Sequence, residues 1–117
     1  MIQTAPQMRI LVAREPIDFR KGIEGTAAVC RTVLQENPME GMLFVFCNRT
    51  RTMIRLLVYD GQGFWLMTKR LSTGRFRHWL QSGDELAETL DAARLQVLLS
   101  GGDWTQVSPA EYWRRVA

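Results

Sequence analysis

The sequence predicts an α+β fold, because its hydrophobic periodicity changes twice along the chain. Apolar residues recur at helical spacing in two segments, from about residue 19 to 36 and from 85 to 100. Between them lie four segments rich in aromatic, β-branched and long apolar side chains, separated by breaks short enough for hairpin turns. We therefore expect a strand, a long helix, a four-strand antiparallel meander, and a C-terminal helix packed on one face of the sheet.

The length of 117 residues suits a single domain, 1–117, with an ordered core from about residue 8 to 104. A short N-terminal lead and a C-terminal tail flank this core. Hydrophobic residues make up 46% of the chain and charged residues 23%, an ordinary globular composition that argues against wholesale disorder.

The first strand is expected over residues 8–13, "MRILVA", which form a short apolar run. Either Glu15, which precedes Pro16, or Asp18 can cap the helix that follows. Pro38 ends this helix, because it disfavours helical geometry in the residue before it. The apolar face of the helix comprises Phe19, Ile23, Ala27, Cys30 and Leu34.

Two glycines, Gly22 and Gly25, lie three residues apart in this predicted helix, although glycine is a poor helix former. They suggest either that the helix packs closely on the sheet or that the segment forms a functional surface. Close packing is the interpretation that we favour.

The strands of the meander are expected at residues 42–48, 52–60, 63–71 and 74–80, and "DGQG" is the clearest turn. The C-terminal helix should then end at Gly101 or Gly102. Its apolar stripe comprises Leu86, Leu90, Ala93, Val97 and Ser100, broadened by Leu95, Leu98 and Leu99. The acidic residues at its start should complement the helix dipole rather than bind a metal: Asp84, Glu85, Glu88 and Asp91.

The cysteines, Cys30 and Cys47, fall in a predicted helix and an apolar strand, a setting typical of small buried thiols in a reducing compartment. A disulfide between them is the less favoured alternative. No signal peptide or membrane-spanning segment is recognisable, so we expect a cytoplasmic protein that does not contact the membrane.

The positive charge lies in one block of the sequence. The chain carries a net charge of +3, but residues 48–79 hold seven basic residues against Asp60 alone, a local charge of +6. The rest of the chain sums to −3. The basic residues of the block are Arg49, Arg51, Arg55, Lys69, Arg70, Arg75 and Arg77.

The strand order predicts where these cations meet. Alternate turns of a meander lie at the same end of the sheet, so the turns at 49–51 and 72–74 should lie together, opposite "DGQG". Such an edge would suit contact with DNA phosphates. The alternative is a plain solvated face, because cations on exposed strands also hinder edge-to-edge aggregation. The aromatic residues nearby are more often core residues than platforms for bases: Phe64, Trp65, Phe76 and Trp79.

No recognisable active site, metal site or cofactor motif is present in the sequence. His78 is the only histidine, which disfavours a multi-histidine metal site or a Ser-His-Asp triad. The glycine pairs match turns better than phosphate-binding loops. We therefore expect a protein that is not an enzyme and that uses no metal or cofactor.

Three segments, in order, resemble the TnpB accessory protein of the insertion-sequence-sixty-six family, encoded by the second open reading frame of those bacterial transposable elements. They are "IDFRKGIEG" (17–25), "LFVFCNRTRTMIRLLVYDGQGFWLMTKRLSTGRF" (43–76) and "LQVLLSGGDW" (95–104). The likeness covers roughly residues 9–104. Two departures are that Thr52 or Met53 replaces a usual aspartate, and that "RHWLQ" replaces a common proline after "GRF".

The resemblance implies an accessory role in DNA transposition, beside a separate transposase that carries the catalytic carboxylates. It also marks signature positions without implying a role for them: Asp18, Arg20, Lys21, Gly22, Asp60, Gly61 and Gly63. We expect a non-catalytic protein that binds DNA through its basic hairpin edge, with weak sequence preference. The alternative is an adaptor that docks onto the transposase or another accessory protein without touching DNA. Oligomeric state is not predicted.

Overall fold

The computed structural model describes residues 8–80, 83 and 85–107. Its elements are β1 (Ile10–Ala13), α1 (Ile23–Thr32), the 3₁₀ helix η2 (Pro38–Glu40), β2 (Leu43–Cys47), β3 (Met53–Tyr59), β4 (Phe64–Arg70), β5 (Ala87–Leu90), α2 (Ala92–Leu99) and the 3₁₀ helix η3 (Trp104–Gln106). The fold is α+β, as predicted. The expectations for the lead, for the end of the tail and for Asp84 lie outside the described residues.

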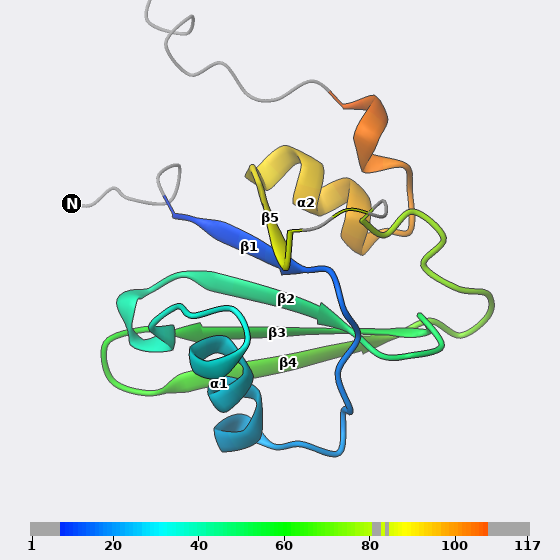
Figure 1. The fold of residues 1–117 in the computed structure, drawn as a ribbon. Coiled ribbons are helices and arrows are strands. Elements are labelled where there is room, and N and C mark those ends of the chain that lie inside the picture. The colour runs from blue at the N-terminus through cyan, green and yellow to red at the C-terminus, as the bar shows by residue number, and fades with distance from the viewer. Residues whose placement is uncertain (1–7, 81–82, 84, 108–117) are drawn as a thin grey trace, which may run out of the picture.

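One five-stranded sheet, in the order β4-β3-β2-β1-β5, forms the centre of the molecule (Figure 1). β2, β3 and β4 form an antiparallel meander. β1 lies inside the sheet, parallel to β2 and antiparallel to β5. Its four residues are all buried, which explains their apolar character.

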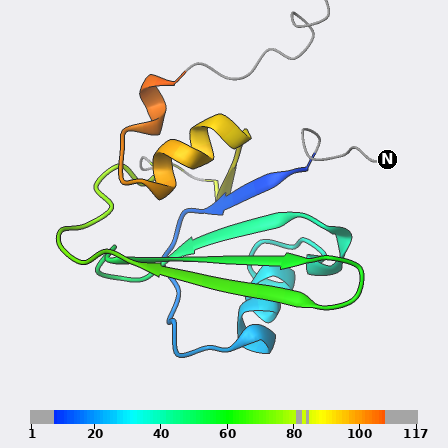
Figure 2. The same cartoon turned by 180° about the vertical axis from the view of Figure 1, so that it is seen from behind.

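The helices cover opposite faces of the sheet (Figures 1 and 2). On one face, α1 buries Ala27 and Cys30 against a cluster that includes Phe44, Phe46 and Leu57. On the other face, α2 packs on a cluster whose buried members are Ile10, Val12, Val45, Cys47, Ile54, Phe76, Trp79, Leu80, Leu90, Leu95, Leu98 and Trp104.

The fourth strand predicted for the meander, residues 74–80, is not a strand. Strict alternation would put Phe76 and Trp79 on opposite faces, but the structure buries both, with Leu80, in a single cluster. The segment instead crosses one end of the sheet, and the Trp79 indole Nε1 donates to the Ala13 carbonyl at 2.9 Å. The free energy gained by burying these large side chains exceeds what the segment would gain by pairing as an edge strand.

The helix predicted at 85–100 begins later in the structure than expected, because its first residues are not helical. Residues 87–90 form β5, which pairs with an otherwise open side of β1, and α2 begins only at Ala92. Asp91 caps α2 by accepting a hydrogen bond from the Arg94 backbone N–H at 2.8 Å. The predicted dipole role therefore holds for Asp91, whereas Glu88 lies in β5.

The first helix is also shorter than predicted. Residues 18–21 form a turn before it, the helix ends at Thr32, and Gln35 then adopts a left-handed φ of 57°. The Glu36 N–H donates to the Cys30 carbonyl, so the chain has turned away from the helix before it reaches Pro38.

The close packing proposed for Gly22 and Gly25 is wrong. Gly22 precedes the first residue of α1 and is exposed, and the atoms nearest to a Cβ at Gly25 would be those of the Lys21 side chain. The buried residues of the helix are Thr26, Ala27 and Cys30 instead, and Ala27 and Cys30 pack in the apolar cluster on this face of the sheet.

Both cysteines are free and buried, on opposite faces of the sheet. Burial raises the pKa of the Cys30 thiol to about 12 and that of Cys47 to about 11. Among the described helices, none has the length and apolar character needed to cross a membrane.

Candidate nucleic-acid interface

The two basic turns lie together at one end of the sheet, where β1, β2 and β4 end and β3 begins. Their contact is direct, because the Leu71 N–H donates to the Thr52 carbonyl at 3.0 Å and the Phe76 N–H donates to the Arg51 carbonyl at 2.7 Å. The chain after Leu71 then crosses this end to reach Ala13. The strand order therefore brings residues from four separate segments to one place.

The side chain of Asn48 builds the β2–β3 turn. Its Oδ1 accepts hydrogen bonds from the backbone N–H groups of Thr52 and Met53, at 2.9 and 3.0 Å. Its Nδ2 donates to the hydroxyls of Thr50 and Thr52. This network fixes the loop and supports Arg51 in a left-handed conformation with φ of 60°.

Five of the seven predicted cations belong to this end, which we call the basic end: Arg49, Arg51, Arg70, Arg75 and Arg77. Arg51 is half-buried, and the other four are exposed. Within the described part of the chain, no carboxylate forms an ion pair with any of the five. Their charge is therefore available to an anion from outside the protein.

The remaining two predicted cations are engaged inside the fold. Arg55 donates to the Lys21 carbonyl at 2.7 Å and to the Thr68 hydroxyl at 3.1 Å, and it stacks over the Phe19 ring at 4.4 Å. Partial burial lowers the pKa of Arg55. The Lys69 ammonium donates to the Leu99 carbonyl at the C-terminus of α2, at 2.6 Å, on the opposite face of the sheet.

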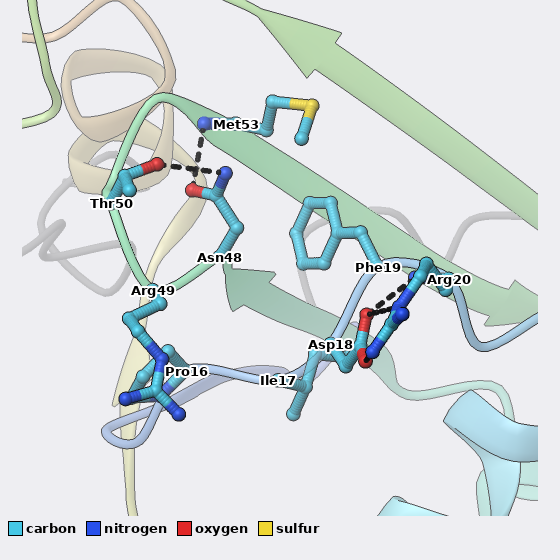
Figure 3. Close-up of a pocket in the computed structure, with 9 residues that line it drawn as sticks. All are labelled: Pro16, Ile17, Asp18, Phe19, Arg20, Asn48, Arg49, Thr50 and Met53. Atoms are coloured by element: carbon cyan, nitrogen blue, oxygen red, sulfur yellow. Dashed lines mark hydrogen bonds and ion pairs between the residues drawn. The ribbon is translucent and has the colours of Figure 1, made fainter.

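A cavity of about 560 Å³ opens beside the basic end (Figure 3). Arg49, Asn48 and Thr50 line it from the β2–β3 turn, and Phe19 and Met53 contribute apolar surface. Pro16, Ile17, Asp18 and Arg20 complete the lining. Asp18 and Arg20 neutralise one another at 2.6 Å, so Arg49 supplies the free positive charge of the wall.

The first signature segment forms a turn that docks on β3. Asp18 accepts hydrogen bonds from the backbone and the guanidinium of Arg20, which hold the pKa of its carboxyl at about 2. The Lys21 carbonyl accepts the hydrogen bond from the Arg55 guanidinium, and Gly22 is the N-cap residue of α1. Asp18 and Lys21 thus serve the local structure through contacts that the sequence alone does not reveal.

The second signature segment closes the hairpin at the opposite end of the sheet. Asp60 Oδ1 accepts from the N–H groups of Gln62 and Gly63, both at 2.9 Å, and Gly61 has a positive φ of 96°. Asp60 Oδ2 also accepts the Trp65 indole N–H at 2.8 Å. These hydrogen bonds lower the pKa of Asp60. This turn is far from the basic end, as the meander predicts.

The comparison with models of known protein families identifies one family. A family model described as "IS66 Orf2 like protein" matches residues 8–109. The chain belongs to the IS66 Orf2-like family. This family is one of accessory proteins associated with transposition and is not a known catalytic family.

Two relatives of this IS66 Orf2-like protein come from Sinorhizobium fredii (strain NBRC 101917 / NGR234). "Uncharacterized protein y4hO" is 38% identical over 114 residues, which cover 97% of this chain and 96% of the relative. "Uncharacterized protein y4jC" is 34% identical over 107 residues, which cover 92% and 90% respectively. No solved structure matches the chain.

Several features of the candidate site in this IS66 Orf2-like protein were missed from the sequence. The cavity depends on Phe19 and Asn48, which are far apart in the sequence and meet because the Ile17 N–H donates to the Cys47 carbonyl at 3.0 Å. Phe76 and Trp79 are core residues, as expected, but Trp65 is 58% exposed. Its place in the edge strand β4 explains this exposure.

Other chemistry at the described residues is sparse. His78 Nδ1 lies 3.8 Å from a carboxylate oxygen of Asp103, and both residues are partly exposed. Within the described ranges, no group of three or more His, Cys, Asp or Glu residues lies close enough together to hold a metal ion.

Proposed function

We propose that this IS66 Orf2-like protein acts in transposition by binding the phosphate backbone of DNA through its basic end. The observation that supports this proposal most strongly is the gathering of four exposed arginines, Arg49, Arg70, Arg75 and Arg77, without carboxylate partners among the described residues. Guanidinium groups suit phosphate oxygens because they donate planar pairs of hydrogen bonds.

The arrangement favours contact with the backbone over base readout. Arg49 lies on the β2–β3 turn, and Arg70 is the last residue of β4. Arg75 and Arg77 lie on the segment that crosses the end of the sheet, so no helix presents the four arginines for insertion into a groove. Phosphate contacts carry no sequence information by themselves. We therefore expect weak sequence preference from this protein alone, with target choice left to a partner such as the transposase.

We also infer that the protein works without catalysing a reaction and without a metal or cofactor. Both thiols are buried with raised pKa values, so they are poor nucleophiles at neutral pH. DNA as the ligand would place the protein in the cytoplasm. The family supports an accessory role, because it is not a known catalytic family.

Fluorescence anisotropy with a labelled DNA duplex, at several salt concentrations, tests this proposal. Four phosphate contacts predict that the logarithm of affinity falls with the logarithm of salt concentration with a slope of about −3.6. Replacing Arg49, Arg70, Arg75 and Arg77 together by alanine should abolish most of the binding and leave the circular dichroism spectrum unchanged. Absence of wild-type binding at low ionic strength would reject the proposal.

A second candidate function is that of an adaptor that docks onto the transposase. It is favoured by an apolar cavity of about 260 Å³ on the α1 side of the sheet, beside the exposed side chains of Val33 and Leu86. Val33→Asp would place a charge in this cavity and should abolish co-purification with the transposase while DNA binding persists. Equal co-purification of the variant and the wild type would reject this role for the cavity.

A further inference from the structure

Among the residues that the structure describes, none forms backbone hydrogen bonds with the outer edge of β4. β4 is the terminal strand of the sheet, and its pairing with β3 matches Leu56 with Met67 and Val58 with Trp65. Two hydrogen bonds flank this pairing, from the Asp60 N–H to the Gly63 carbonyl and from the Leu71 N–H to the Thr52 carbonyl. They show which alternate residues of β4 bond to β3. The odd-numbered residues therefore bond to β3, and the N–H and C=O groups of Phe64, Leu66, Thr68 and Arg70 point outward.

The same strand exposes large apolar side chains on the α2 face of the sheet. Trp65 is 58% exposed and Met67 is 44% exposed. They are neighbours on one face because strand residues two apart share a side. Exposed aromatic and methionine side chains beside an open strand edge are typical of an interface.

The geometry points to a second copy of this chain as the partner, with the two β4 strands paired antiparallel across a two-fold axis. The pairing that uses every outward group matches Phe64 with Arg70 of the second copy and Leu66 with its Thr68. In this register the axis passes through Met67, which faces Met67 of the second copy. Trp65 then faces Lys69 of the second copy.

The side chains fit this register in two ways. The facing pairs at Met67 and at Trp65 are the non-hydrogen-bonded pairs, whose side chains approach most closely, so the exposed apolar surface is buried at the centre. In addition, the cation Arg70 ends β4, and Asp60, whose carboxylate accepts the Trp65 indole N–H, lies beside the other end of the strand. Antiparallel pairing brings these opposite charges together, whereas parallel pairing in register would set cation against cation.

Trp65 and Met67, which carry this inference, are not part of the basic end, so a substitution at Met67 leaves the charges proposed to bind DNA in place. Sedimentation velocity of the full chain at several concentrations tests it, together with the variant Met67→Lys. Two lysines would meet at the axis, so the variant should sediment as a monomer under conditions in which the wild type is a dimer. Met39→Lys is the matched control, since Met39 is 53% exposed and lies on η2, outside β4.

A cross-linking variant tests the register even if the lysine variant does not fold. Met67→Cys places two thiols across the axis at the spacing that a disulfide requires, and Cys30 and Cys47 are buried and should not compete. Mild oxidation should convert Met67→Cys, but not Met39→Cys, to a covalent dimer. A monomeric wild type at all concentrations, a dimer unaffected by Met67→Lys, or equal cross-linking of both cysteine variants would overturn the inference.

Discussion

At the scale of single residues, the Asn48 side chain is what holds the turn that carries the cations Arg49 and Arg51. One amide side chain satisfies two backbone N–H groups and two hydroxyls in the turn that carries Arg49 and Arg51. The sequence "NRTR" predicts a turn, because asparagine favours turns, but it does not say that the asparagine organises the whole loop.

Asn48→Ala should lower the free energy of unfolding by about 2 kcal/mol, because it leaves two partly buried N–H groups without acceptors. Asn37→Ala is the control, since Asn37 accepts one hydrogen bond, from the Met39 N–H at 3.0 Å. Its loss should cost about 1 kcal/mol or less. Urea denaturation measures both values, and an equal cost for the two variants would contradict the role assigned to Asn48.

The buried thiols predict a dependence of stability on alkaline pH. In the unfolded chain the thiols ionise near their ordinary pKa of 9.0, whereas in the folded chain they stay neutral until pH 11 to 12. Ionisation therefore favours the unfolded chain as pH rises, so this contribution is full below pH 9 and declines from there towards pH 11.

Cys47→Ala should make the free energy of unfolding fall less steeply between pH 9 and pH 11 than it does in the wild type. Urea denaturation at several pH values within this window measures the two slopes. Identical slopes would show that the Cys47 thiol does not remain neutral in the folded protein.

At the scale of elements, the segment from Leu71 to Leu80 is the part of the fold that the sequence described least well. Its alternating pattern predicts a strand, and strand propensity was a reasonable basis for that prediction. The burial of Phe76 and Trp79 on the same side overrides it. The same limitation applies to residues 87–90, because the four-residue spacing of Leu86 and Leu90 places two side chains on the same side of a β-strand as well as of a helix.

Trp79→Phe should lower the free energy of unfolding by about 1–3 kcal/mol, because it removes the hydrogen bond to the buried Ala13 carbonyl and part of a buried ring. The same substitution at the exposed Trp65 should change it by less than about 0.5 kcal/mol. Thermal or urea unfolding at low protein concentration gives both values. A larger effect at Trp65 than at Trp79 would contradict the described path of this segment.

At the scale of the whole molecule, the meander alone predicted that the 49–51 and 72–74 turns meet, and they do. Sequence reasoning could not separate Arg55 and Lys69 from the rest of the cations. Their partners, the Lys21 and Leu99 carbonyls, come from the helical layers, whose positions no pattern within the strands reveals. The cavity is also a product of tertiary structure, since its walls come from two loops that are distant in the chain.

The central claim is that the location of the cations, rather than the total charge, determines DNA binding. Two charge-matched double variants separate these possibilities. Arg49→Ala with Arg70→Ala removes two charges from the basic end. Arg9→Ala with Arg31→Ala removes two exposed charges elsewhere: Arg9 precedes β1 at the opposite end of the sheet, and Arg31 lies in the last turn of α1.

The salt dependence of duplex binding, measured by fluorescence anisotropy for these two variants and the wild type, is the most direct test. The account predicts that the first variant lowers the magnitude of the salt slope by about two, one unit for each lost phosphate contact, and that the second leaves it close to the wild-type value. An equal loss in both variants, or a larger loss in the second, would contradict it.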